Sequence, residues 1–333
     1  SSARHGVAAR GTPPVSVARM PARDPDAVDG DDHTVAAEPD GTAPVDPGEP
    51  MITAPRWLEL GAVGGAVVLA SVGSVGLLLA INERYRTDLA ILLAAPIVAV
   101  AMVAVARAIP VRSSTRTAHA GAAAAVVIAL GFGAFAGVAP AQNVVVSRDP
   151  GSYLTTARWL VREGKLSDDA RGQAFAGIDG LTFAGAAQYD MGGTRRKAVD
   201  GTPANGAGKI EFQFNHLASV ALASGYDVGG HRLMFRLPAL MSAGTLVLVY
   251  AVAVRVGKRP LLALLAPVLL AAALPMLYVA RNTYSESFAS VLLWAAVLLA
   301  IGLHRRPRAA TGAVTGLLLG ALVSTRVDAL LYV

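Results

Sequence analysis

The segment 147–154 reads SRDPGSYL and places an acid, a proline and an aromatic side chain directly after an apolar run. An aspartate followed by proline is an ordinary helix start, because Asp caps the first turn and Pro fits its first position. A carboxylate at Asp149, held at a membrane surface with Tyr153 four residues on, is also suited to act as a general base. Both interpretations of Asp149 are open at this stage.

A second group of polar residues follows a later apolar run, in the segment 278–286, YVARNTYSE. Thr283-x-x-Glu286 fits a capping box that would start the next helix. Arg281 and Glu286 would also lie at the same membrane face as Asp149, and polar groups gathered at one depth are functional candidates. Arg326 and Asp328, near the end of the last apolar run, either extend to the membrane surface or supply a guanidinium to a phosphate.

The composition explains what must position these residues. Of 333 residues, 54% are hydrophobic and 16% are charged, whereas soluble domains average about 45–50% apolar and about 25% charged. Mean hydropathy is +0.50, and the apolar residues form long blocks, which predicts an integral membrane protein. The net charge is +6, and the basic residues cluster in short loops beside those blocks. This distribution is typical of membrane topology, so no nucleic-acid partner is expected. Absence of cysteine excludes disulfides and thiolate chemistry.

The apolar blocks predict an all-α polytopic membrane protein with about seven transmembrane helices. Residues 1–55 are rich in Pro, Gly, Asp and Ala and are expected to form a disordered cytoplasmic tail. Residues 56–141 would hold helices 1–3, residues 142–232 one large loop, and residues 233–333 helices 4–7. The expected spans are 57–81, 88–109, 118–141, 233–255, 260–280, 285–303 and 309–330.

Basic residues give the expected orientation. Three alternate short loops carry three basic residues each, so the positive-inside rule places them and the N-terminus in the cytoplasm. The chain would then be a multi-pass plasma-membrane protein with loop 142–232 outside. Within that loop the pattern predicts a helix over 149–163 ended by Gly164, a short strand near 210–214, and a helix over 217–223 lying at the membrane surface. The Gly-rich segment 171–209 stays unassigned.

These residues are similar to the GT-C superfamily of polytopic glycosyltransferases, related to protein mannosyltransferases and the lipid A aminoarabinose transferase. In that family an acidic motif opens the first large outer loop, with a Tyr four residues after the first acid. Asp149 and Tyr153 match it, and TTARWLVREGKL resembles the helix that follows. Pro150 stands where the family carries its second acid. The segments 236–259 and 274–295 resemble later family spans, and the likeness covers about 142–333.

The resemblance implies a polyprenyl-phosphate sugar donor used at the outer face, with a lipid, glycan or protein hydroxyl as the acceptor. Asp149 would be the catalytic base and the reaction would invert the anomeric centre. Tyr153, Arg281, Glu286, Arg326 and Asp328 would bind substrate, with Arg281 or Arg326 balancing phosphate charge. No cofactor is expected, and without the second acid no residue pattern supports a divalent metal.

Two other interpretations remain open. A lipid or sugar transporter would need ionisable residues or broken helices near the bilayer midplane. A non-catalytic membrane protein would also fit Pro150 in place of the second acid. Because the chain starts at Ser1 without Met and stops at Val333 within an apolar run, we expect a fragment whose missing part lies C-terminal.

Overall fold

The computed structural model describes residues 53–109, 114–143, 149–169, 188–190, 209–212, 214–326 and 328. These residues belong to one unit, Gly48–Val333. The expected tail at 1–55 lies outside the described residues except for its last three positions, and most of the Gly-rich segment 171–209 lies outside them too.

Helices dominate the described chain because an apolar segment in lipid must satisfy its backbone groups internally. Five of them are long and apolar enough to cross a membrane, which makes this a helical membrane protein. They are α1 (Arg56–Ile81), α2 (Thr87–Ala108), α3 (Arg116–Val138), α5 (Leu217–Gly257) and α8 (Glu286–Arg305).

Two of the seven expected spans differ from simple crossings. The span expected at 260–280 consists of the 3-10 turn η2 (Leu262–Leu264), α6 (Leu265–Ala272) and α7 (Leu274–Arg281). The chain bends between α6 and α7, and these helices form a sixth crossing only if the bent pair is one span. The bend is 63°. Pro275 accounts for it, because proline lacks an N–H and clashes with the preceding helical turn. The last expected span is α9 (Ala309–Thr325), a shorter helix of 17 residues.

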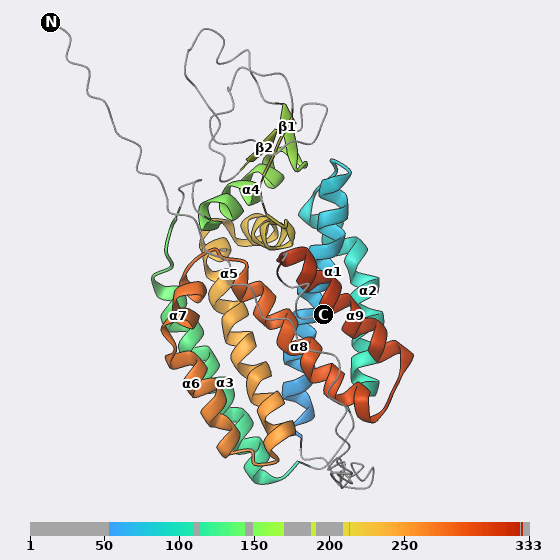
Figure 1. Ribbon diagram of the computed structural model, residues 1–333, viewed down its shortest axis with the longest axis vertical. Coiled ribbons are helices and arrows are strands. Elements are labelled where there is room, and N and C mark those ends of the chain that lie inside the picture. The colour runs from blue at the N-terminus through green and yellow to red at the C-terminus, as the bar shows by residue number, and fades with distance from the viewer. Residues whose placement is uncertain are drawn as a thin grey trace, which may run out of the picture. The chain divides into compact units, whose positions relative to one another are not determined.

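If the bent pair α6–α7 is taken as one unit, consecutive helices of the bundle run in opposite directions, so the connections gather at its two ends (Figure 1). We call the end that carries α4 (Asp149–Glu163) the α4 end and the other the opposite end. At the opposite end, Nη2 of Arg56 donates to the carbonyl of Ala106 at 2.7 Å, which ties the start of α1 to the end of α2. At the α4 end, the backbone N–H of Tyr85 donates to the carbonyl of Gly164 at 2.9 Å.

The helix predicted over 149–163 is confirmed as α4, and it ends where Gly164 adopts a φ of +69°. Its apolar face, with Tyr153, Leu154, Ala157 and Leu160, is buried. Strand β3 (Lys209–Phe212) confirms the strand expected near 210–214. It pairs antiparallel with β1 (Ser167–Asp169) and β2 (Gln188–Asp190), in the order β1-β3-β2. The loop thus adds a small sheet to a fold expected to be all-α.

Helix α5 joins two elements that were predicted separately, the short helix at 217–223 and the span at 233–255. Its helical geometry breaks at Gly229 and at Gly230, where φ is +61°. Glycine reaches such a left-handed backbone without steric cost. The chain therefore turns sharply there, and the part of α5 before the break, yellow in Figure 1, is seen nearly end-on above the bundle.

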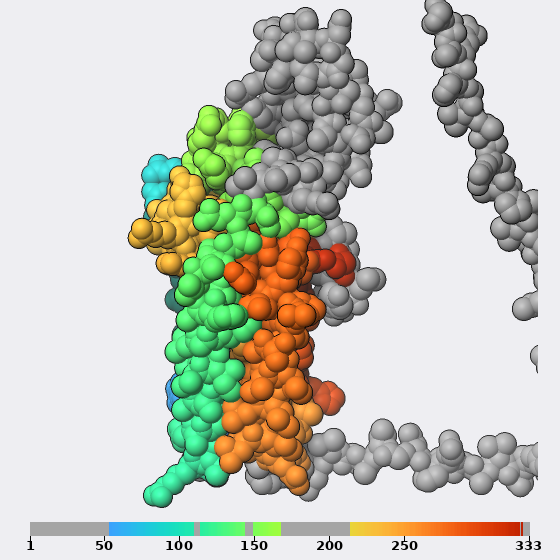
Figure 2. Space-filling model, turned by 90° about the vertical axis from the view of Figure 1, so that its left-hand side faces the viewer, coloured from blue at the N-terminus to red at the C-terminus, as the bar shows by residue number. Residues whose placement is uncertain are grey.

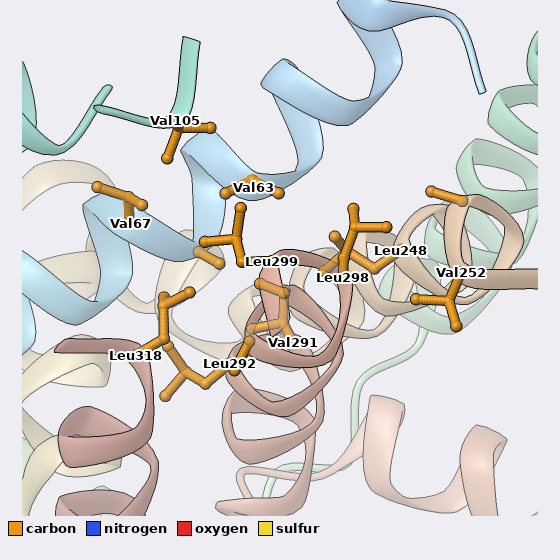
Figure 3. Close-up of a cluster of buried hydrophobic side chains, with 14 of the residues drawn as sticks. Val63, Val67, Val105, Leu248, Val252, Val291, Leu292, Leu298, Leu299 and Leu318 are labelled. Atoms are coloured by element: carbon orange, nitrogen blue, oxygen red, sulfur yellow. The ribbon is translucent and has the colours of Figure 1, made fainter. Parts of the chain in front are cut away.

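The core of the bundle is a set of buried aliphatic side chains from α1, α2, α5, α8 and α9 (Figure 3). It includes Val63, Val67, Val105, Leu248, Val252, Val291, Leu292, Leu298, Leu299 and Leu318. Helices α3 and α6 lie side by side on another face of the bundle (Figure 2). A smaller cluster at the α4 end joins α4 to the first part of α5 and to Phe288 of α8. This second cluster positions α4.

One ion pair lies inside the bundle, between Glu59 of α1 and Arg255 of α5. The guanidinium donates from Nε to Oε1 at 3.0 Å and from Nη2 to Oε2 at 2.5 Å, and both side chains are almost fully buried. Nη1 of Arg255 also donates to the carbonyl of Leu298 in α8 at 2.9 Å. The pair therefore joins three helices through a forked geometry that suits an arginine and a carboxylate.

Removing one partner of this pair should destabilise the fold strongly, because the other charge would stay buried and unpaired. We expect Arg255→Met or Glu59→Leu alone to lower the free energy of unfolding by about 3–5 kcal/mol. The double variant should recover most of the loss, since an apolar pair of similar volume replaces the ions. Thermal unfolding in lipid nanodiscs measures both. The control is Asp88→Asn, which removes the exposed partner of Arg86 and should leave the unfolding midpoint unchanged. Equal destabilisation by Asp88→Asn and by Glu59→Leu would contradict the special role of the buried pair.

Candidate functional site

Three charged residues meet at the α4 end, where α8 begins and α9 ends. Nη1 of Arg326 lies 2.5 Å from Oε1 of Glu286, and its Nε and Nη2 donate to the two carboxylate oxygens of Asp328 at 2.8 and 2.9 Å. The side chains are between 29% and 44% exposed. The hydrogen bonds to Asp328 raise the pKa of Arg326 above its ordinary value, and Arg326 lowers the pKa of Asp328. The group carries a net charge of −1 at neutral pH.

Glu286 keeps one oxygen unused. Its Oε1 is paired with Arg326, whereas Oε2 is buried and has no hydrogen-bond partner. A buried carboxylate oxygen without a donor is costly. It is therefore a position at which a hydroxyl from a bound molecule would be favourable.

Tyr153 of α4 joins the same region. Its hydroxyl donates to Oγ of Ser285 at 3.0 Å, and its ring stacks on Phe214 with ring centroids 5.3 Å apart. Burial raises the pKa of Tyr153 to about 12, so the hydroxyl stays protonated at neutral pH. The charges of Glu286, Arg326 and Asp149 all act on this hydroxyl. Tyr153 thus supplies a protonated hydroxyl beside the charged residues Glu286 and Arg326.

Asp149 lies in the first turn of α4 and its side chain is exposed. It makes no hydrogen bond or ion pair with another described residue. Its charge nonetheless helps to raise the pKa of Tyr153 and of Tyr284, as does that of Glu286. Asp149 therefore belongs to the same electrostatic group as Glu286, with a carboxylate that is not engaged by a protein cation among the described residues.

The capping-box interpretation of Thr283 and Glu286 is wrong. Helix α8 begins after Ser285, and no side chain caps it. The hydroxyl of Thr283 donates instead to the carbonyl of Pro150 at 2.9 Å, in a buried contact. A tertiary contact has replaced the local one, and it holds the first turn of α4 against the connection between α7 and α8.

Arg281 lies at the same end but outside the charged group. Its Nε and Nη2 both donate to the carbonyl of Ala139, at 2.9 and 2.7 Å, and its own carbonyl accepts from the N–H of Ala141. It thereby ties the end of α3 to α7. No carboxylate of the described chain neutralises Arg281, which distinguishes it from Arg326.

Several contacting residues were not singled out by the sequence. Tyr284 hydrogen-bonds with Tyr278 at 3.1 Å, and this bond together with burial raises the pKa of Tyr284 to about 12. Nδ2 of Asn215 donates to the carbonyl of Val323 at 2.5 Å, joining the end of the loop to the last turn of α9. The run of polar residues from Asn282 to Ser285 was the available signal, but it did not reveal which side chains face α4.

Within the part of the chain that the structure describes, no three His, Cys, Asp or Glu residues converge closely enough to hold a metal ion. At the described site, positive charge beside the carboxylates comes from Arg326. No protein-family model, curated protein or solved structure matches this chain. The functional argument therefore rests on the residues and their geometry.

The lowered pKa of Asp328 gives a pH prediction. The pairing with Arg326 stabilises the folded state fully above about pH 4, the ordinary pKa of an aspartate, and this contribution is lost as the pH falls through the lowered pKa. We expect Asp328→Asn to lack this part of the pH dependence, so that its unfolding midpoint approaches that of the parent chain in acid. Thermal unfolding in nanodiscs between about pH 7 and about pH 3 tests this. Asp328→Glu keeps a carboxylate and should retain the pH dependence. If the unfolding midpoints of the parent chain and of Asp328→Asn changed in parallel with pH, the stabilising role of the Asp328 carboxylate would be refuted.

Proposed function

We propose that this chain is a membrane glycosyltransferase that moves a sugar from a polyprenyl-phosphate donor to a hydroxyl of a lipid, glycan or protein. The proposal is carried by one observation at the α4 end of the bundle. The carboxylate of Asp149, which pairs with no described residue, acts through its charge on the hydroxyl of Tyr153, as do Glu286 and Arg326, and Arg326 also pairs with Asp328. A donor with an apolar chain and a charged head suits a site at the boundary between bundle and loop. The likeness of Asp149 and Tyr153 to the GT-C motif adds to this support.

In the proposed reaction Asp149 takes the proton of the acceptor hydroxyl as that oxygen attacks the anomeric carbon. The bond between the anomeric carbon and the phosphate oxygen breaks, its electron pair leaves with the polyprenyl phosphate, and the configuration inverts. Asp149 suits the role because its carboxylate is exposed and is paired with no cation among the described residues. Oε2 of Glu286 and the hydroxyl of Tyr153 would hydrogen-bond and orient hydroxyls of the bound molecules.

The geometry favours Arg281 over Arg326 as the partner of the leaving phosphate. Arg326 already shares its donors between two carboxylates, so its charge is compensated. Among the described residues, the guanidinium of Arg281 donates only to the carbonyl of Ala139, so its positive charge is available to stabilise developing negative charge. It is two residues from Thr283, which contacts Pro150 beside Asp149.

We further propose that the α4 end faces the outside of the plasma membrane and that α6–α7 and α9 also cross it, which gives seven crossings. The support is the distribution of charge. Arg56, Arg107, Arg259, Arg305 and Arg308 lie at the opposite end, whereas the α4 end mixes acids with bases. An excess of arginine and lysine in short connections marks the cytoplasmic side.

A transporter is the second candidate, and the break between α6 and α7 favours it, because broken helices form the binding sites of many transporters. The residues around this break are Ala272, Ala273, Leu274 and Pro275. They bring no polar side chain to a substrate or ion. Glu59 and Arg255, the buried charged residues of the part of the chain that the structure describes, satisfy one another. We therefore place transfer chemistry first.

Replacing Asp149 by Asn should lower sugar transfer by about 10²- to 10⁴-fold, the usual contribution of a general base. Membranes containing the full chain, incubated with labelled polyprenyl-phosphate sugars, provide the measurement through the labelled product. Glu286→Gln should reduce the rate less, since it removes a hydrogen-bonding charge and not the base. Glu163→Gln, at the other end of α4, is the matched control and should keep the parent rate. Full activity of Asp149→Asn at equal protein level would exclude the proposed role.

A further inference from the structure

A groove of about 560 Å³ lies between α2 and α9 at the opposite end of the bundle, away from the candidate site. This volume is within the range of about 300–1,000 Å³ that is common for ligand sites. Val100 and Val103 in its wall are 72% and 50% exposed, although they are aliphatic. The apolar wall is made of Ala99, Val100, Val103, Ala104 and Ala310.

Two arginines close one end of this groove. Arg107 belongs to the last turn of α2 and Arg308 directly precedes α9, and both side chains are exposed. The guanidinium of Arg308 donates to the backbone carbonyl of Arg107, which holds the two residues together. Neither guanidinium is paired with a carboxylate of the described chain. The apolar groove thus ends at two guanidinium groups that no carboxylate of the described residues neutralises.

We propose that this groove binds an anionic phospholipid of the surrounding bilayer. One acyl chain would lie along the aliphatic wall, and the phosphate would accept hydrogen bonds from Arg107 and Arg308. Guanidinium groups match phosphate oxygens well, and basic side chains at a membrane boundary attract anionic headgroups. A water-soluble anion would leave the aliphatic wall unused, and a neutral lipid would leave both charges uncompensated.

The test uses photoactivatable phosphatidylglycerol and phosphatidylcholine, each carrying the reactive group in an acyl chain, with the full chain in nanodiscs. Cross-linked peptides are mapped by mass spectrometry. We expect phosphatidylglycerol to label the groove residues of α2 and α9 preferentially. Arg107→Gln and Arg308→Gln should each reduce this labelling about fivefold, which corresponds to the effect of one basic side chain near a membrane surface.

Matched variants separate binding from folding. Arg308→Lys keeps the charge and should retain most of the labelling, whereas Val103→Trp fills the groove and should reduce it. Arg259→Gln removes one exposed charge at the same end but outside the groove, and should change nothing. Equal labelling by the two lipids, or unchanged labelling in both Gln variants, would overturn the proposal. Displacement of phosphatidylglycerol by a small mole fraction of polyprenyl phosphate would also overturn it, by assigning the groove to the carrier lipid.

Discussion

The forked ion pair between Glu59 and Arg255 is the interaction on which the arrangement of the bundle depends. A charge in a hydrocarbon environment is tolerated only when it is paired and hydrogen-bonded. Both conditions are met here because α1, α5 and α8 have one relative placement in which the two side chains and the carbonyl of Leu298 coincide. The surrounding valines and leucines contribute apolar burial, which is non-directional and constrains the placement of the helices less sharply. The polar contact therefore specifies the register, and the apolar contacts contribute the bulk of the packing.

The placement of these helices also positions α4, through apolar packing and two hydrogen bonds. The part of α5 before Gly229 and Gly230 carries residues that pack under α4, while the part after the break belongs to the bundle. Two further polar contacts complete the attachment, from Thr283 to Pro150 and from Asn215 to α9. The charged residues of the candidate site come from α4, α8 and the end of α9. Arg326 and Asp328 are close in sequence, whereas Glu286 reaches Arg326 through the placement of α8 beside α9.

This explains what could and could not be predicted from sequence. Long apolar runs, the Gly164 stop and the alternation near 210–214 are local signals, and the corresponding helices and strand are present. The helix at 217–223 and the span at 233–255 were predicted as separate elements, but their extent was underestimated, because the intervening residues are helical up to the turn at Gly229 and Gly230. The pairing of Glu59 with Arg255 joins positions 196 residues apart, so no local pattern encodes it. Thr283 and Glu286 fitted a capping box by spacing alone, yet Thr283 hydrogen-bonds to Pro150 of α4 and Glu286 pairs with Arg326 at the end of α9. Asp149, Glu286 and Arg326 were singled out because all three were expected at the same membrane face; the structure brings Arg326 and Glu286 into contact, and their functional roles stay predictions.

The length of α9 has a consequence for the bilayer itself. Its 17 residues span about 26 Å at about 1.5 Å per residue, whereas the hydrocarbon layer is about 30 Å thick. An arginine stands at each end, Arg308 and Arg326. Such hydrophobic mismatch is relieved by local thinning of the bilayer or by side chains reaching outward to the headgroups. In the proposed topology, in which α9 crosses the membrane, lipids beside it would be compressed along the membrane normal, and their headgroups would lie closer to Arg326 than in the unperturbed bilayer.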